Sequence, residues 1–214
     1  MTTLILVRHG QSVANLGGIF AGHTDIPLTE LGLLQARRTA AYLDAYPIDY
    51  IYSSDLLRAM QTAEATATRR GMEIRPHEGL REVYAGDWEG ALFADLPVHY
   101  PESFRIWREH FGLAQPDHGE SIRDLAERLQ TTVVELVKKH PGKTLALFTH
   151  AAAIRSLATG WHGYPIEEAE RIAFPPNASV TLVDFDDNLT PHLRLYGYDD
   201  HQAEAATSLP AGSV

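Results

Sequence analysis

The chain contains no cysteine among its 214 residues. This absence excludes disulfide bonds, a catalytic thiolate and metal sites built on sulfur. Any covalent catalysis must therefore use another nucleophile, and any metal ion must be held by His, Asp or Glu side chains.

Long hydrophobic runs are missing as well. Hydrophobic residues make up 44% of the sequence, yet no apolar stretch approaches the roughly 20 residues that a membrane-spanning helix needs. The first residues, MTTLILV, lack the basic flank, the longer apolar core and the cleavage site of a secretory signal. We therefore expect a soluble, cytoplasmic protein with no membrane partner.

Positive charge is scarce. The chain has 18 Lys and Arg against 28 Asp and Glu, which gives a net charge of −10 at pH 7. This balance disfavours binding to nucleic acid or to an anionic membrane surface. Only three of the cations are lysines, so the positions of the arginines must show whether they gather around an anion.

What the sequence does contain is an alternation of apolar, strand-like runs with helix-like segments. The strand-like runs cover residues 3–7, 49–54, 73–76, 144–150, 178–185 and 192–197. The helix-like segments cover residues 28–46, 54–71, 121–142 and 151–160. Such alternation is typical of α/β proteins, and it predicts a three-layer α/β/α sandwich with a mostly parallel central sheet.

Between these segments, residues 84–120 are rich in Gly, Pro, His and aromatics, and they predict a small inserted lobe of loops and short helices. We expect a single domain over residues 1–200 and a loose tail over residues 201–214. Ser54 or Asp55 is expected to cap the second helix, and Ser121 the third.

Polar side chains follow three of the apolar runs. Arg8 and His9 come directly after the first, His150 after the run that starts at residue 144, and Arg58 in the first turn of the helix after residues 49–54. In open α/β sheets, ligands bind outside the carboxyl ends of the strands. Cationic side chains beside helix N-termini suit a compact anion, so this edge predicts a phosphate site.

Each of these residues also has a purely structural explanation. A histidine at a strand end, such as His9, is commonly just a hydrogen-bonded residue, and His150 could simply cap the helix that follows it. Arg58 could pair with Asp55 or Glu64 on its own helix. The argument for a phosphate site therefore depends on their conjunction at three strand ends.

Six motifs occur in a fixed order, namely LVRHGQS, FAGHTDIPLTELGLLQA, SSDLLRAMQTA, LREVYAGDWEG, GESIRDLAERL and FTHAAAIRS. Together they resemble the histidine phosphatase superfamily, in its phosphoglycerate-mutase-like branch. The resemblance runs from the first strand to about residue 185.

The resemblance implies a role for individual residues. His9 would be the nucleophile that takes up the phosphoryl group, and Glu82 would be the proton donor. The phosphate pocket would contain Arg8, Arg58 and His150, with Asn15 as a further phosphate contact. Ala21, Gly22 and Ala151 would complete the substrate-binding residues.

General chemistry supports these roles. Fixed cations stabilise the charge on the oxygens of a transferring phosphoryl group. Imidazole attacks only in its neutral form, which nearby arginines favour over the protonated form. A carboxylic acid could protonate the leaving alkoxide, and its carboxylate could then activate water against the phosphohistidine.

The function implied is hydrolysis of small phosphomonoesters, and two alternatives stay open. One is a cofactor-dependent phosphoglycerate mutase, although residues 90–120 contain neither the lysine nor the adjacent arginine pair that mutases carry there. The other is a non-catalytic protein that binds a phosphorylated ligand. The expected partner is a small phosphorylated metabolite, whose identity the sequence does not give, and the oligomeric state is equally unspecified.

Two further expectations concern the site. The nine histidines other than His9 and His150 show no metal-ligand spacing, so we expect neither a metal nor another cofactor. Ala151 stands where many members of the family have glycine. If the backbone there needs a positive φ, the pocket must be rearranged.

Overall fold

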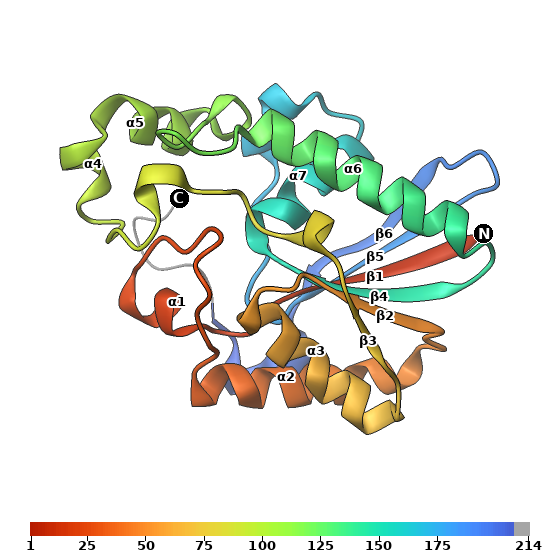
Figure 1. The fold of residues 1–214 in the computed structure, drawn as a ribbon. Coiled ribbons are helices and arrows are strands. Elements are labelled where there is room, and N and C mark those ends of the chain that lie inside the picture. The colour runs from red at the N-terminus through yellow and green to blue at the C-terminus, as the bar shows by residue number, and fades with distance from the viewer. Residues whose placement is uncertain (208–214) are drawn as a thin grey trace.

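A computed structural model describes residues 1–207 of the protein, and Figure 1 shows its fold. Six strands form one sheet in the order β3-β2-β4-β1-β5-β6. They are β1 (Thr2–Arg8), β2 (Tyr50–Ser53), β3 (Ile74–Pro76), β4 (Thr144–Thr149), β5 (Val180–Phe185) and β6 (Pro191–Tyr198). Strands β1 to β4 are parallel to one another, whereas β5 pairs antiparallel with β1, and β6 pairs antiparallel with β5 at the edge of the sheet.

Helices cover both faces of this sheet. The α-helices are α1 (Val13–Gly17), α2 (Glu30–Tyr42), α3 (Leu57–Arg70), α4 (Leu96–His99), α5 (Pro101–Glu109), α6 (Ile122–Lys139) and α7 (Ala151–Trp161). In Figure 1, α2 and α3 lie below the sheet and α6 and α7 above it. The α/β sandwich with a mostly parallel sheet is therefore confirmed.

The continuous apolar character of β1 follows from burial on both faces. Leu4 and Leu6 pack into the hydrophobic cluster that contains the inner side chains of α6 and α7. Ile5 and Val7 pack into a second cluster, which includes side chains of α3. Because successive side chains of a strand point to opposite faces, a strand between two helical layers has no polar side.

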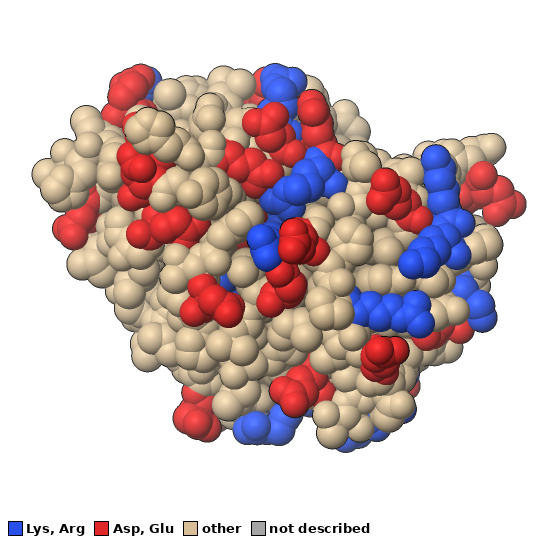
Figure 2. Space-filling view, viewed as in Figure 1, with Lys and Arg blue, Asp and Glu red and all other residues tan. Residues whose placement is uncertain are grey.

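The lobe formed by residues 84–120 contains α4 and α5 and the short 3₁₀ helices η3 (Gly86–Trp88) and η4 (Phe111–Leu113). Its large aromatic side chains are buried in the same cluster as those of α6 and α7; they are Trp88, Phe104, Trp107 and Phe111. The charged side chains on the visible surface of the lobe, at the left of Figure 2, are mainly Asp and Glu.

The cap expected for the second helix is wrong. This helix, α3, begins only at Leu57, whose amide N donates to the Oδ1 atom of Asp25 at 2.6 Å. Asp55 instead pairs with Arg81. The carboxylate that caps α3 thus comes from a distant loop, which local sequence does not indicate. By contrast, Ser121 does cap α6 as predicted.

The expectation of a loose tail is wrong for residues 201–207. The segment Asp200–Ala205 forms the 3₁₀ helix η6, and Gln202 is fully buried. The Nε2 atom of Gln202 donates to Thr39 Oγ1 at 2.9 Å, and Gln35 on the same helix α2 donates to the carbonyl of Ala205 at 2.6 Å. Polar side chains of α2 therefore hold this segment, which the Ala, Ser, Gly and Pro content of the tail does not indicate. Residues 208–214 lie outside the described part of the chain.

Candidate active site

The parallel pairing of β1 with β4 brings two histidines together. Arg8 is in register with Thr149, and the amide N of His9 donates to the carbonyl of Thr149 at 3.0 Å. His9 and His150, the residues directly after the two strands, consequently have ring centroids 5.2 Å apart. The sequence prediction that strand ends gather these side chains is confirmed.

His9 is held in one tautomer. Its Nδ1 atom lies 2.7 Å from the carbonyl O of Gly10. A carbonyl can only accept, so Nδ1 carries the proton and the neutral ring keeps its lone pair on Nε2. Burial, and then the charges of Arg58 and Arg8, hold the pKa of His9 well below its usual value, so the ring is neutral at pH 7.

Arg8 and Arg58 are both about 1% exposed, and their hydrogen bonds go to backbone carbonyls. Arg58 donates to Ala21, Gly22 and Thr24 at 2.8–3.0 Å, and Arg8 donates to Pro175 at 2.7 Å. Burial lowers the pKa of each to about 10, so both stay charged at pH 7. Within residues 1–207 neither forms an ion pair with a carboxylate, which leaves two buried positive charges available to an anion.

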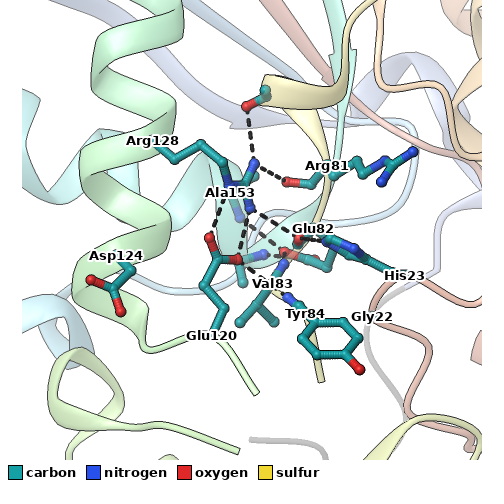
Figure 3. Close-up of polar contacts among 12 residues, drawn as sticks. Gly22, His23, Arg81, Glu82, Val83, Tyr84, Glu120, Asp124, Arg128 and Ala153 are labelled. Carbon is teal, nitrogen blue, oxygen red and sulfur yellow. Dashed lines mark hydrogen bonds and ion pairs between the residues drawn. The ribbon is translucent and has the colours of Figure 1, made fainter. Parts of the chain in front are cut away.

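Glu82 lies at the N-terminus of α7. Its carboxylate accepts hydrogen bonds from the amides of Ala152 and Ala153, at 3.1 and 3.2 Å, and of Val83 at 3.0 Å (Figure 3). An acidic side chain is stabilised at such a helix end by the exposed N–H groups. Glu82 is thereby held beside the histidine pair.

The other two carboxylates near Glu82 in sequence are placed differently. Glu89 accepts hydrogen bonds from the backbone amides of His23, Thr24 and Ala85, and it does not line the cavity at the site. The Glu78 side chain is 79% exposed. Glu82 is thus the acidic side chain among the three that faces the cavity.

The close approach of Glu89 explains Gly22. A Cβ atom at Gly22 would lie 2.4 Å from Oε1 of Glu89 and 2.5 Å from the carbonyl O of Val83. Gly22 does not itself line the cavity, but its carbonyl accepts from Arg58. Its neighbour Ala21 does line the cavity and also accepts from Arg58.

Asn15 lines the cavity from α1, where its Oδ1 atom accepts hydrogen bonds from Ser12 and from Asn177. Since the amide oxygen is used in this way, the NH₂ group is the part of Asn15 that can donate to a ligand. Asn177, which also donates to the carbonyl of His9, was not anticipated, because it lies in a loop far along the chain.

Ala151 is the first residue of α7 and is not among the residues with positive φ. The methyl group at this position therefore causes no backbone strain, and the rearrangement considered for it is not needed.

His150 packs against His9, one of the residues that line the cavity. His150 is fully buried, and it is absent from the residues that line the cavity. Its Nε2 atom lies 2.8 Å from Ser54 Oγ, whereas its Nδ1 atom has no hydrogen-bond partner among residues 1–207. Burial and then Arg58 hold the pKa of His150 well below its usual value. The expected role of His150 in a phosphate pocket thus stays a prediction.

Two chemically distinct groups of side chains line the cavity, and we call them the polar side and the apolar side. The polar side consists of Arg8, His9, Ser12, Asn15, Arg58 and Glu82. The apolar side consists of Ile19, Phe20, Val83, Phe93, Trp107 and Phe174. None of the apolar-side residues was predicted, because they come from separate loops and from the lobe and share no periodicity.

Neither a metal cluster nor a membrane-crossing helix is found in the part of the chain that the structure describes. No three His, Asp or Glu side chains within residues 1–207 are grouped as metal ligands. No helix in that range is both long enough and apolar enough to span a bilayer.

Comparison with known proteins gives consistent results. The family profile of the histidine phosphatase superfamily (branch 1) matches residues 4–197. Glucosyl-3-phosphoglycerate phosphatase of Mycobacterium tuberculosis is 34% identical over 186 residues, which are 83% of this chain and 83% of that protein. Phosphoserine phosphatase 1 of Hydrogenobacter thermophilus is 29% identical over 211 residues, 95% of this chain and 100% of that protein.

Solved structures agree with this. YhfR of Bacillus stearothermophilus has a TM-score of 0.89 at 31% identity, and the match covers 94% of this chain and 99% of that one. The mycobacterial glucosyl-3-phosphoglycerate phosphatase in complex with VO3 has a TM-score of 0.86 at 31% identity, covering 92% of this chain and 99% of that one.

Proposed function

The chain belongs to branch 1 of the histidine phosphatase superfamily and is a phosphomonoester hydrolase, and we propose that it works through a phosphohistidine on His9. The observation that carries this proposal is the tautomer of His9. The hydrogen bond from Nδ1 to Gly10 leaves a lone pair on Nε2, and His9 lines the same cavity as two buried arginines, Arg8 and Arg58. In the first step Nε2 attacks phosphorus and the ester P–O bond breaks.

Arg8 and Arg58 bind the phosphoryl group in this proposal. Their charges stabilise the non-bridging oxygens in the transition state with little reorganisation, because backbone carbonyls already fix both guanidinium groups. Two buried nitrogen atoms at the site, Nε of Arg8 and Nδ1 of His150, lack a hydrogen-bond partner within the described part of the chain. Unpaired buried groups are unfavourable, so an oxyanion that accepts from them would complete the site. Asn15 contributes a further donor.

Glu82 acts in both steps. As an acid it protonates the departing oxygen, and as a carboxylate it then removes a proton from the water that attacks phosphorus and releases His9. Its place on the polar side of the cavity, next to the N-terminus of α7, supports this role.

The apolar side of the cavity receives the leaving group. Arg105 of the lobe pairs with Glu102 and Glu109, and neither Arg105 nor Arg108 lines the cavity. No cation from the lobe is therefore placed to bind a second phosphate or a carboxylate. We infer that the substrate is a small phosphorylated metabolite whose leaving group presents an alkyl or aromatic surface and carries no second anionic group.

The setting that suits this substrate is the cytoplasm, where phosphorylated metabolites are retained by their charge. Nucleic acid does not fit as a partner, since the net charge is −10 and the charged groups on the visible surface of the lobe are mainly acidic (Figure 2).

The role of Glu82 is tested by two esters that differ in their need for an acid. Phenethyl phosphate releases an alkoxide, whereas p-nitrophenyl phosphate releases a stable phenolate. Glu82→Gln should lower kcat/KM on the phenethyl ester by about 10² to 10⁴, the usual contribution of a positioned acid, and much less on the nitrophenyl ester. The exposed Glu78→Gln is the matched control and should leave both values unchanged. Equal losses of kcat/KM on both esters in Glu82→Gln would mean that Glu82 binds substrate or stabilises the fold and does not donate a proton.

A further inference from the structure

Glu82 lies on a segment that no regular secondary structure fixes. It falls between the 3₁₀ helix η2 (Glu78–Leu80) and η3, where the chain runs without helix or strand. Its backbone carbonyls must therefore find donors elsewhere.

Those donors come largely from one residue of α6, Arg128. Its Nη1 atom donates to the carbonyls of Gly79 and Arg81, at 3.0 and 3.2 Å, and its Nη2 atom donates to the carbonyl of Glu82 at 3.2 Å. Figure 3 shows the guanidinium group of Arg128 between α6 and this segment. One side chain thus contacts three of the four carbonyls from residue 79 to residue 82.

The remaining donors of Arg128 orient it. Its Nε and Nη2 atoms donate to the two carboxylate oxygens of Glu120, at 2.9 and 2.8 Å. The three carbonyls and this bidentate pair use all five N–H groups of the guanidinium. The pair is largely buried, with side-chain exposures of 27% for Arg128 and 17% for Glu120.

Glu120 also holds the chain on the other side of Glu82. Its amide N donates to the carbonyl of Tyr84 at 2.8 Å, and its Oε2 atom accepts from the amide N of Tyr84 at 3.2 Å. Gly119 allows this approach, because a Cβ atom there would lie 2.5 Å from the carbonyl of Tyr84. The backbone is consequently held on both sides of Glu82, by Arg128 before it and by Glu120 after it.

We propose that Arg128 is a positioning residue for Glu82, with Glu120 as its anchor. The inference rests on the proposed role of Glu82 as proton donor. It explains the motif GESIRDLAERL, none of whose residues lines the cavity at the site. Within it, Glu120 and Arg128 hold the acid while Ser121 caps the helix that carries Arg128. A shift of the Glu82 backbone would move the carboxyl group away from the leaving oxygen, and small displacements of that kind reduce rates strongly.

The test uses Arg128→Gln with the same two esters. We expect kcat/KM to fall by about 10-fold to 100-fold on phenethyl phosphate, part of the 10² to 10⁴ that a positioned acid contributes, and by less than about threefold on p-nitrophenyl phosphate. Inhibition by inorganic phosphate should be unchanged, because the arginines that bind phosphate are not touched. Arg123→Gln is the matched control, since Arg123 lies on the same helix in an exposed ion pair with Glu167.

A conservative variant separates positioning from charge. Arg128→Lys keeps the charge but offers three donors in place of the planar fork, so it should show the same selective loss to a smaller degree. It also serves as the measured variant if Arg128→Gln does not fold. A loss of similar size on both esters, or no loss on either, would overturn the proposal.

The double variant Glu82→Gln/Arg128→Gln tests whether the two residues act together. If Arg128 acts through Glu82, the double variant should match Glu82→Gln on the phenethyl ester. Multiplied losses would show that Arg128 acts through another group and would overturn the inference. If Glu82→Gln lowers kcat/KM equally on both esters, the proposed role of Glu82 as proton donor is wrong. That outcome can be told apart from a failure of the Arg128 inference, in which Glu82→Gln is selective but the losses multiply.

Discussion

The polar side and the apolar side of the cavity differ in how the protein holds them. Arg8, His9 and Arg58 stand at strand ends or in a first helical turn, and backbone carbonyls fix their side chains. Phe93 and Phe174 instead lie on irregular segments. The cations and the nucleophile that contact the phosphoryl group are thus fixed at the edge of the sheet, whereas these two apolar-side residues are not.

Apart from changes at His9 and Glu82, the largest effect is expected on the polar side, from Arg58→Met. Because removing one preorganised donor to a developing oxyanion costs about 10² to 10³ in rate, kcat/KM should fall by that factor on both phenethyl and p-nitrophenyl phosphate. Arg69→Met, on the same helix but in an exposed pair with Asp44, should have no effect. If Arg58→Met kept activity within about tenfold on both esters, the phosphate would be bound elsewhere.

A smaller and selective effect is expected on the apolar side, from Phe93→Ala. Phe93 is partly buried and packs against Phe20, with ring centroids 5.1 Å apart. Loss of this surface should lower kcat/KM by about tenfold, or 1.4 kcal/mol, on phenethyl phosphate, and should hardly change it on glycerol 3-phosphate. Leu113→Ala, an exposed lobe residue, is the control.

Two results would remove the distinction between the sides. One is an equal loss on both substrates in Phe93→Ala. The other is hydrolysis or isomerisation of 3-phosphoglycerate that exceeds hydrolysis of the phenethyl ester, since the apolar side offers its carboxylate no cation.

The smallest effect concerns stability rather than rate. Burial holds the pKa values of His9 and His150 well below 6.5 in the folded protein, so the unfolded chain binds more protons as the pH falls below that value. The free energy of unfolding should therefore be highest above pH 6.5 and fall between pH 6.5 and 5, by up to about 1.4 kcal/mol per pH unit for each such histidine.

Urea unfolding at several pH values measures this slope. Other histidines also contribute, because burial lowers the pKa values of His140 and His201. His150→Asn removes one of the four groups, so its slope should be shallower than that of the wild type. A stability that does not change over this range would contradict the burial of neutral imidazoles at the site.

The sequence could predict the part of the site that lies at strand ends. The strands that carry Arg8, His9 and His150 are short apolar runs, and the parallel sheet then places their ends together. Glu82 was found only through the family resemblance, since nothing local distinguishes it from Glu78 or Glu89.

Contacts between distant segments were beyond prediction. The cap of α3 by Asp25, the hold of Arg128 on residues 79–82 and the packing of Gln202 on α2 all join residues at least 32 positions apart. Such contacts depend on tertiary packing, which the hydrophobic periodicity of the sequence does not indicate.

The most direct test of the account is a rapid-quench experiment with phosphorus-labelled p-nitrophenyl phosphate. The wild type should form an acid-labile, base-stable phosphoprotein within one turnover, and Glu82→Gln should accumulate it because the water is no longer activated. The label should be absent from His9→Ala. Label retained in that variant, or turnover by the wild type without any phosphoprotein, would contradict His9 as the nucleophile.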